Sequence, residues 1–125
     1  MLGTNNLEES KKFYDSIMEV LGYSKGLIDH KGRCMYRSES GVFLLTKPIN
    51  GEPASHGNGM TIGFSASTPE LIDTWHETGV KNGGETCEEP PGIRVSGDRQ
   101  LYLGYLRDPA GNKICAAHFM KNQID

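Results

Sequence analysis

The stretch that decides the fold is residues 101–119, LYLGYLRDPAGNKICAAHF. Its centre, DPAGN at positions 108–112, carries turn chemistry in order: an Asp that accepts backbone N–H bonds, a Pro with a preset φ, and a Gly free to take a positive φ. Apolar and β-favouring residues flank this turn on both sides. The pattern predicts a β-hairpin.

Length and composition limit the class of protein. A chain of 125 residues corresponds to one domain with a core of its own. The formal net charge is -3 and no Lys/Arg cluster supplies a basic stripe, so no nucleic-acid partner is expected. No apolar run approaches the roughly 20 residues that span a bilayer, and no signal segment begins the chain, so no membrane association is expected. Three cysteines without CxxC spacing favour a reducing cytoplasm over a disulfide framework or a zinc knuckle.

The first part of the chain reads as one β-α-β-β-β unit. Asn6 with Glu9 three residues later forms a capping box, and apolar residues recur at helical spacing until Gly22. This pattern predicts a helix. Three short strands are expected after it, separated by glycine turns, at residues 23–30, 33–39 and 42–47.

The second part repeats this order. Residues 59–66 read as a strand, and Pro69 near the start of a polar-capped segment opens a second helix. A short strand near residues 85–87 and the hairpin follow. We therefore expect a single domain over residues 1–125, with modules 1–48 and 59–125 joined by the turn-rich linker 49–58. Two such units bury their small sheets by pairing, which predicts an α+β fold in which paired sheets curve into a cup with helices outside.

Three local patterns stand in order along the chain: LEESKKFYD at 7–15 ahead of Leu-Gly-Tyr at 21–23, GNGMTIGF at 57–64, and RDPAGNKI at 107–114. Together they resemble the vicinal oxygen chelate superfamily, which groups glyoxalase I, bleomycin-resistance proteins and extradiol dioxygenases. The resemblance spans nearly the whole chain and implies a cup that binds a small organic molecule. Members of this family often pair, and a very short first strand leaves a sheet edge to cover, so a homodimer is expected.

The resemblance also implies where a divalent metal ion would bind, because the family's metal enzymes carry His, Gln or Glu at fixed strand positions. Here those positions hold Cys115, Thr61 and Leu44, and the first-strand His would lie upstream of Met1. One thiol and one hydroxyl are a poor substitute for several N or O donors. We therefore predict no metal and no other cofactor, with a divalent metal ion as the alternative.

Strand alternation places Cys115 and Ala117 on one face of the last strand, which lines the cup if the family's Glu position does. A packed, inert thiol is the interpretation we favour for Cys115, and a reactive nucleophile is the alternative. Tyr102 is expected near the edge of the cup and Tyr105 on the opposite face, in the core. Arg94 is a candidate clamp for an anionic ligand or a plain exposed arginine. The residues expected to contact a ligand are Thr61, Cys115, Leu44, Tyr102, Ala117 and Arg94.

Two functions remain open. In the first, as in bleomycin-resistance proteins, the cup sequesters a small molecule with apolar walls and a few polar groups. In the second, a metal-dependent lyase or isomerase of the glyoxalase I type abstracts a proton next to a carbonyl, which requires a Lewis acid and a carboxylate base. Neither group stands at the expected positions, so the sequence favours binding and identifies no catalytic residue.

Overall fold

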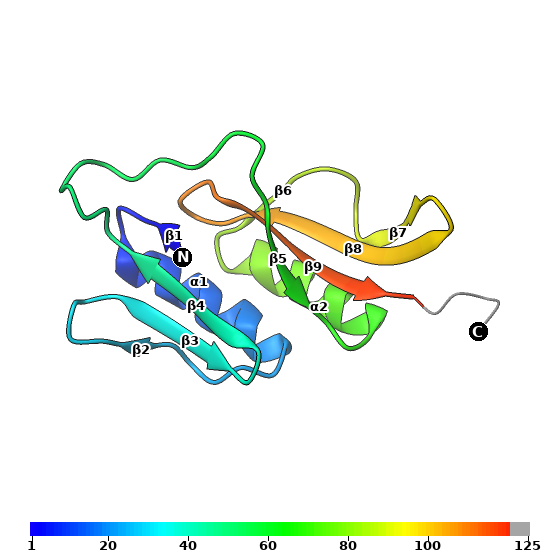
Figure 1. The fold of residues 1–125 in the computed structure, drawn as a ribbon, viewed down its shortest axis with the longest axis horizontal. Helices are drawn as coiled ribbons and strands as arrows, with labels where there is room; N and C mark the ends of the chain where they lie inside the picture. Colours follow the sequence, from blue (N-terminus) through cyan, green and yellow to red (C-terminus); the bar gives the residue numbers. More distant parts are fainter. Residues whose placement is uncertain (121–125) are drawn as a thin grey trace.

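The protein is represented by a computed structural model in which residues 1–120 are described (Figure 1). The first module contains β1 (Leu2–Gly3), α1 (Leu7–Val20), β2 (Leu27–Ile28), β3 (Cys34–Ser38) and β4 (Gly41–Thr46). The second module contains β5 (Ile62–Ser65), α2 (Pro69–Lys81), β6 (Glu85–Thr86), β7 (Gly92–Ser96), β8 (Arg99–Arg107) and β9 (Lys113–Phe119). None of the helices within residues 1–120 is long and apolar enough to cross a membrane.

The strands form two mixed sheets with the same internal plan. The first sheet has the order β1-β4-β3-β2, and the second has the order β5-β9-β8, with both β6 and β7 paired to the outer edge of β8. In each sheet the first strand of the module lies parallel to its last strand. This repeat confirms the predicted α+β fold of two βαβββ modules. No strand pairing joins the two sheets within the described part of the chain.

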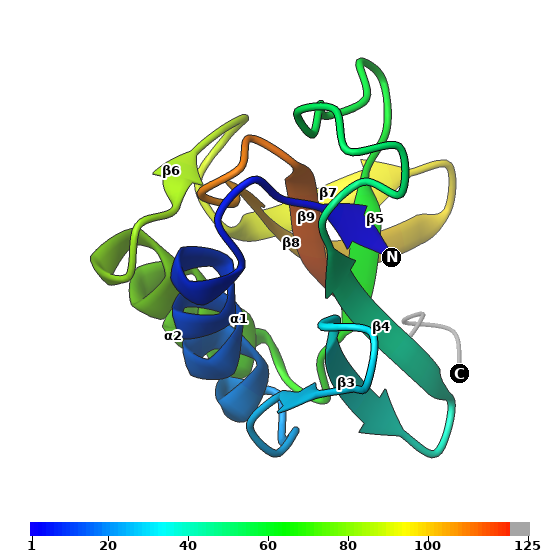
Figure 2. The same cartoon turned by 90° about the vertical axis from the view of Figure 1, so that its left-hand side faces the viewer.

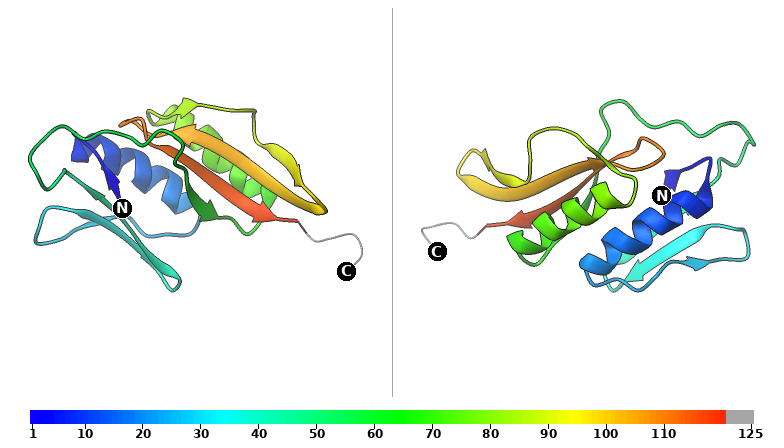
Figure 3. Two further views of the ribbon diagram at one scale, coloured as in Figure 1. Left: turned by 45° about the horizontal axis from the view of Figure 1, so that its top comes forward. Right: turned by 180° about the vertical axis from the view of Figure 1, so that it is seen from behind.

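Each helix begins where its capping residue predicts. The Asn6 side chain accepts the Glu9 backbone N–H at 3.0 Å, and the Thr68 hydroxyl accepts that of Leu71 at 3.2 Å. Helix α1 packs on β4, α2 packs on β8 and β9, and the two helices pack on each other. Figure 2 shows both helices together on one side of the molecule, and the rear view in Figure 3 shows them in front of the sheets. The opposite face of each sheet therefore carries no helix.

We call these two surfaces the open faces. Strand alternation and pairing place the side chains of Met35, Arg37, Val42 and Leu44 on the first open face. The same rule places Arg94, Leu101, Leu103, Tyr105, Arg107, Lys113, Cys115, Ala117 and Phe119 on the second open face. Neither surface is as deeply buried as the helix-facing side of its sheet.

One hydrophobic core serves both modules. Phe13 and Tyr14 of α1 are fully buried and stack edge to face, with ring centroids 5.0 Å apart. The ring of Phe43 on β4 meets the ring of Phe64 on β5 at 5.1 Å, also edge to face. Aromatic pairs of this geometry stabilise contacts beyond the area they bury. Side chains therefore join the modules where backbone hydrogen bonds do not.

The predicted DPAGN turn is buried at both ends, Asp108 and Asn112, and ties the two modules together. Asp108, which is 3% exposed, accepts hydrogen bonds from the Tyr14 hydroxyl at 2.6 Å and from the backbone N–H groups of Ala110 and Asn112. The Asn112 amide donates both to Asp108 and to the Gly3 carbonyl in β1. The pKa of the Tyr14 hydroxyl is raised well above its usual value, mainly by burial and secondly by the Asp108 carboxylate. Tyr14 therefore keeps its proton and stays a hydrogen-bond donor.

Several strand boundaries differ from the prediction. The segment predicted as a strand over 23–30 pairs only at Leu27–Ile28, because just before it the Gly26 N–H donates to the Asp15 carboxylate of α1 and not to β3. The strand predicted over 59–66 is shorter in the structure, since β5 begins only at Ile62, and Met60 before it is 55% exposed. The second module has one more strand than predicted. After β6 the chain leaves the edge of β8 between Thr86 and Gly92, and it pairs with β8 again as β7.

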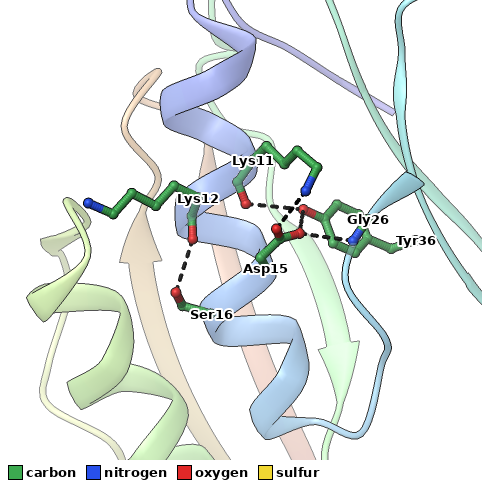
Figure 4. A network of polar contacts seen from close by, with 6 residues as sticks. All are labelled: Lys11, Lys12, Asp15, Ser16, Gly26 and Tyr36. Atoms are coloured by element: carbon green, nitrogen blue, oxygen red, sulfur yellow. Dashed lines mark hydrogen bonds and ion pairs between the residues drawn. The ribbon is translucent and has the colours of Figure 1, made fainter. Parts of the chain in front are cut away.

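A polar network holds the segment before β2 against α1 (Figure 4). The Asp15 carboxylate accepts from the Lys11 ammonium at 2.7 Å, the Gly26 backbone N–H at 2.9 Å and the Tyr36 hydroxyl at 2.8 Å. Burial alone would raise the pKa of Asp15, but the bonds from Lys11, Gly26 and Tyr36 outweigh it and lower the pKa overall. The network fixes the irregular chain path that replaces the first part of the predicted strand, before Leu27.

Tyr36→Phe is expected to lower the free energy of unfolding by about 1 kcal/mol, because Asp15 loses one of its donors while the ring stays packed. The pKa of Asp15 is expected to rise toward its ordinary value. Urea unfolding and an NMR titration of the Asp15 carboxyl carbon measure the two effects. Ser16→Ala is the control, since its exposed hydroxyl bonds only the Lys12 carbonyl in the same helix. Equal losses in both variants would show that the network contributes nothing specific.

Candidate functional site

The open faces bring together only some of the residues predicted to bind a ligand. Cys115 and Ala117 lie side by side on the second open face, paired across the sheet with Gly63 and Ser65 of β5. Thr61 is exposed and lies immediately before β5. Leu44 is half-buried and lies on the first open face, on the other sheet. The predicted residues therefore divide between two sheets.

The placement of the two tyrosines is the reverse of the prediction. Tyr102 pairs with His118 and donates its hydroxyl to Asp73 of α2 at 2.7 Å, so it lies on the helix side of β8. Tyr105 pairs directly with Cys115, and residues paired directly across two strands project from the same face. Tyr105 is therefore the tyrosine on the second open face. The prediction of Tyr102 at the cup was wrong because the face depends on the register between β8 and β9.

Arg94 lies on β7, opposite Leu101, at the outer part of the second open face. Its guanidinium donates to the backbone carbonyls of Glu89 and Pro90, each at 3.1 Å. Arg94 thus braces the segment 87–91 that joins β6 to β7. Its role as an anion clamp stays a prediction.

The most polar part of the second open face is a group that the sequence reasoning missed. Lys113, whose side chain is 24% exposed, forms an ion pair with Glu88, and its ammonium lies 5.0 Å from the centroid of the Tyr105 ring. With Cys115 beside Tyr105, these residues form what we call the lysine cluster: Lys113, Glu88, Tyr105 and Cys115. The hydrogen bond to Glu88 raises the pKa of Lys113, against the opposing effect of burial.

The sequence contains a signal for two members of the lysine cluster, Lys113 and Cys115. Lys113 stands two residues before Cys115, so strand alternation already placed both on one face. Glu88 had no such signal, because it reaches the face from a loop. It is the only non-glycine residue with a positive φ, 59°, within residues 1–120.

The cysteine environment favours inert thiols. The pKa of the Cys115 thiol is raised, mainly by burial and secondly by the Glu88 carboxylate, while the Lys113 ammonium acts to lower it. Burial likewise raises the pKa of Cys87 and of Cys34. A thiol with a raised pKa is a poor nucleophile at neutral pH. Cys115 is therefore better placed as a wall of a binding surface than as a reacting group.

A small cavity of about 220 Å³ lies where the two modules meet. Phe43 and Phe64 line it from the core, Val42 from the first open face and Gly63 from the second. Enclosed sites for drug-sized ligands are usually about 300–1,000 Å³. The cavity suits a small group, and residues of both modules line it.

The described residues do not fit a divalent metal ion. Within residues 1–120 no three His, Cys, Asp or Glu side chains stand close enough to hold one. At the positions implied by the resemblance, Cys115 offers a thiol with a raised pKa, Thr61 a hydroxyl and Leu44 no donor. Hard divalent ions require several charged or imidazole donors at fixed geometry.

Comparison with solved structures identifies the class to which this fold belongs. The structure is similar to that of a glyoxalase/bleomycin resistance protein from Albidiferax ferrireducens T118, with a TM-score of 0.91, 56% sequence identity and coverage of 94% of both chains. It shares its fold with a glyoxalase/bleomycin resistance protein/dioxygenase family enzyme from Burkholderia phytofirmans PsJN, with a TM-score of 0.71, 14% identity and coverage of 95% of this chain and 94% of that one.

A glyoxalase-related enzyme from Fulvimarina pelagi gives a similar result, with a TM-score of 0.69, 19% identity and coverage of 93% of this chain and 82% of that one. No family model matches the sequence, and no curated protein matches it. Two βαβββ modules with one helix-free face each define a glyoxalase-like fold. The identity to the Albidiferax protein over almost the full chain shows that this chain belongs to the glyoxalase/bleomycin resistance protein family.

Proposed function

We propose that the protein binds a small organic molecule on its open faces and that it does so without a metal ion. The observation that carries this proposal is the second open face, where the apolar side chains of Leu103 and Ala117 adjoin a compact polar group, the lysine cluster. Binding surfaces for small molecules combine apolar walls with a few placed polar groups. Membership of the glyoxalase/bleomycin resistance family supports the same interpretation.

The chemistry of the individual residues favours binding over catalysis. The thiol of Cys115 has a raised pKa, and the Tyr102 hydroxyl is already bonded to Asp73. The Glu88 carboxylate is paired with Lys113 and is not available as a base while that pair holds. No activated group is needed for a molecule to rest against Leu103, Ala117 and the Tyr105 ring.

The test is a thermal-shift screen of small organic molecules with chelator present, followed by NMR mapping of each hit. Hits are expected to shift the backbone amide signals of Cys115 and Ala117. Ala117→Glu, which puts a charge into the apolar part of the second open face, is expected to weaken binding at least about tenfold. Ser55→Glu makes the same charge change on an exposed linker residue and is expected to leave affinity unchanged. Hits that map elsewhere, or that survive Ala117→Glu, contradict the proposal.

The alternative, a metal-dependent lyase or isomerase acting on a small carbonyl substrate, has its own test. Metal content is measured in untagged protein purified without chelator and challenged with Ni²⁺, Zn²⁺, Mn²⁺ and Fe²⁺. We expect no stoichiometric ion. About one ion per chain that is lost in Cys115→Ala would overturn the metal-free proposal and place a lyase or dioxygenase assay next.

Two further expectations from the sequence stay predictions. One is a homodimer, for which β1 and β5, each at the end of its sheet, offer edges that a second copy can cover. The other is a cytoplasmic location, which the cysteine pattern favours.

A further inference from the structure

The Lys113–Glu88 ion pair is formed between a strand and a loop. Lys113 is fixed at the start of β9, where it pairs with Arg107 of β8, and its ammonium lies over the Tyr105 ring. Thr86 pairs with Leu106, and Gly92 pairs with Leu103. Residues 87–91, which include Glu88, therefore stand opposite only Gly104 and Tyr105. We call residues 87–91 the bulge. The Glu88 carboxylate therefore comes from the bulge, and the Lys113 ammonium comes from the sheet.

The bulge holds Glu88 in a disfavoured conformation. Its φ of 59° lies in the left-handed region, which non-glycine residues adopt only when their surroundings impose it. Arg94 braces the carbonyls of Glu89 and Pro90 but makes no bond to Glu88. The Glu88 side chain is 44% exposed, so solvent reaches it. Among the described residues, Lys113 is the only ion-pair partner of the Glu88 carboxylate.

A second carboxylate, that of Glu85 in β6, stands on the same face opposite Arg107, two strands away from Lys113. Within the described residues Glu88 is the only acidic partner of Lys113 within 4.0 Å. The neighbouring cations are already bonded to backbone carbonyls, Arg107 to Gly111 and Arg94 to the bulge. A half-buried ammonium beside an aromatic ring attracts any anion that can approach it. When Glu88 leaves, the position is therefore open to the anionic group of a ligand.

We propose that Lys113 binds an anionic group of the ligand and that Glu88 occupies this position in the free protein as an internal competitor. The inference rests on the proposed function and names the ligand class: a small organic carboxylate whose apolar or aromatic part lies on Tyr105, Leu103 and Ala117. One carboxylate replaces another at Lys113, and no covalent bond changes. The affinity of such a ligand is reduced by the fraction of molecules in which Glu88 is in place.

The test uses acids paired with their neutral amides: benzoate with benzamide, phenylacetate with phenylacetamide, and hexanoate with hexanamide. Dissociation constants are measured by NMR titration of the wild-type protein, Glu88→Gln and Lys113→Met. Glu88→Gln removes the competing charge and is expected to tighten binding of the acids about threefold, the size typical of a partly exposed ion pair. Lys113→Met keeps the apolar stem and is expected to weaken the acids about tenfold.

Two controls separate the cluster from general charge effects. Glu89→Gln makes the same change one residue away in the same exposed bulge, and Lys81→Met breaks an exposed ion pair with Glu77 on α2. Both are expected to leave all affinities unchanged. The amides are expected to bind every variant equally. A melting curve checks that Lys113→Met is folded, and Lys113→Gln replaces it if it is not.

The outcomes distinguish this inference from the proposed function. If acids and amides bind the wild-type protein alike, and neither Glu88→Gln nor Lys113→Met changes the acids, the inference is wrong while the binding function stands. The inference is also wrong if Glu88→Gln weakens the acids, because Glu88 would then help to bind them. If no acid binds the second open face of any variant, the inference fails, and the wider thermal-shift screen decides the proposed function.

Discussion

Asp108→Ala is expected to lower the free energy of unfolding by about 3–5 kcal/mol, because it leaves buried donors without an acceptor. The donors that lose their partner are the Tyr14 hydroxyl and the backbone N–H groups of Ala110 and Asn112. Asn112 also loses one of its two acceptors, which loosens its bond to Gly3 in the first module. Urea unfolding followed by circular dichroism gives the change.

The matched control for this prediction is Asp98→Ala. Asp98 is exposed in the tight turn between β7 and β8, so its loss is expected to change stability by less than about 0.5 kcal/mol. If both alanine variants lose the same small amount, the buried turn contributes no more than an ordinary surface turn. The predicted contribution of the Asp108 hydrogen bonds to stability would then be wrong.

Phe13→Ala is expected to cost about 3–5 kcal/mol, the range found when a buried aromatic ring is removed from a core. Phe13 is fully buried at the junction of the two helices. A Cβ at Gly79 would lie 3.4 Å from its ring, and a Cβ at Gly84 would lie 2.7 Å from it. The ring thus occupies space left by two glycines, Gly79 in α2 and Gly84 just after it, and glycines have no side chain with which to refill that space.

Phe119→Ala is the control for this prediction, because Phe119 is 63% exposed on the second open face. Its removal is expected to change the free energy of unfolding by less than about 1 kcal/mol. Denaturant unfolding of both variants, with the slope of the transition compared, shows whether the two modules still unfold together. A small loss for Phe13→Ala would contradict a single core shared by the modules.

The hairpin and the helices were predictable because their signals are local. Turn chemistry at 108–112 fixed the position of the β8–β9 turn, and the capping residue Asn6 fixed the start of α1. The strand predicted over 23–30 pairs only at Leu27–Ile28, which shows the limit of local signals. Its residues favour strands, but the hydrogen bond from the Gly26 N–H to Asp15 diverts the chain.

The site was less predictable because it depends on contacts across the fold. Alternation within β9 correctly put Cys115 and Ala117 on one face. The prediction assigned Tyr102 and Tyr105 to the wrong faces of β8. The faces follow from the register between β8 and β9, which a single sequence does not give. Glu88 was missed because it reaches Lys113 from a bulge opposite Tyr105, at a position without any periodic pattern.

The contact between Phe43 and Phe64 has a consequence for how proteins with this fold diversify. The two rings join the modules at 5.1 Å, and both also line the cavity of about 220 Å³ where the modules meet. A smaller side chain at either position enlarges the space for a ligand and at the same time removes part of the core. Selection for larger molecules therefore requires compensating stabilisation elsewhere, such as at the buried turn.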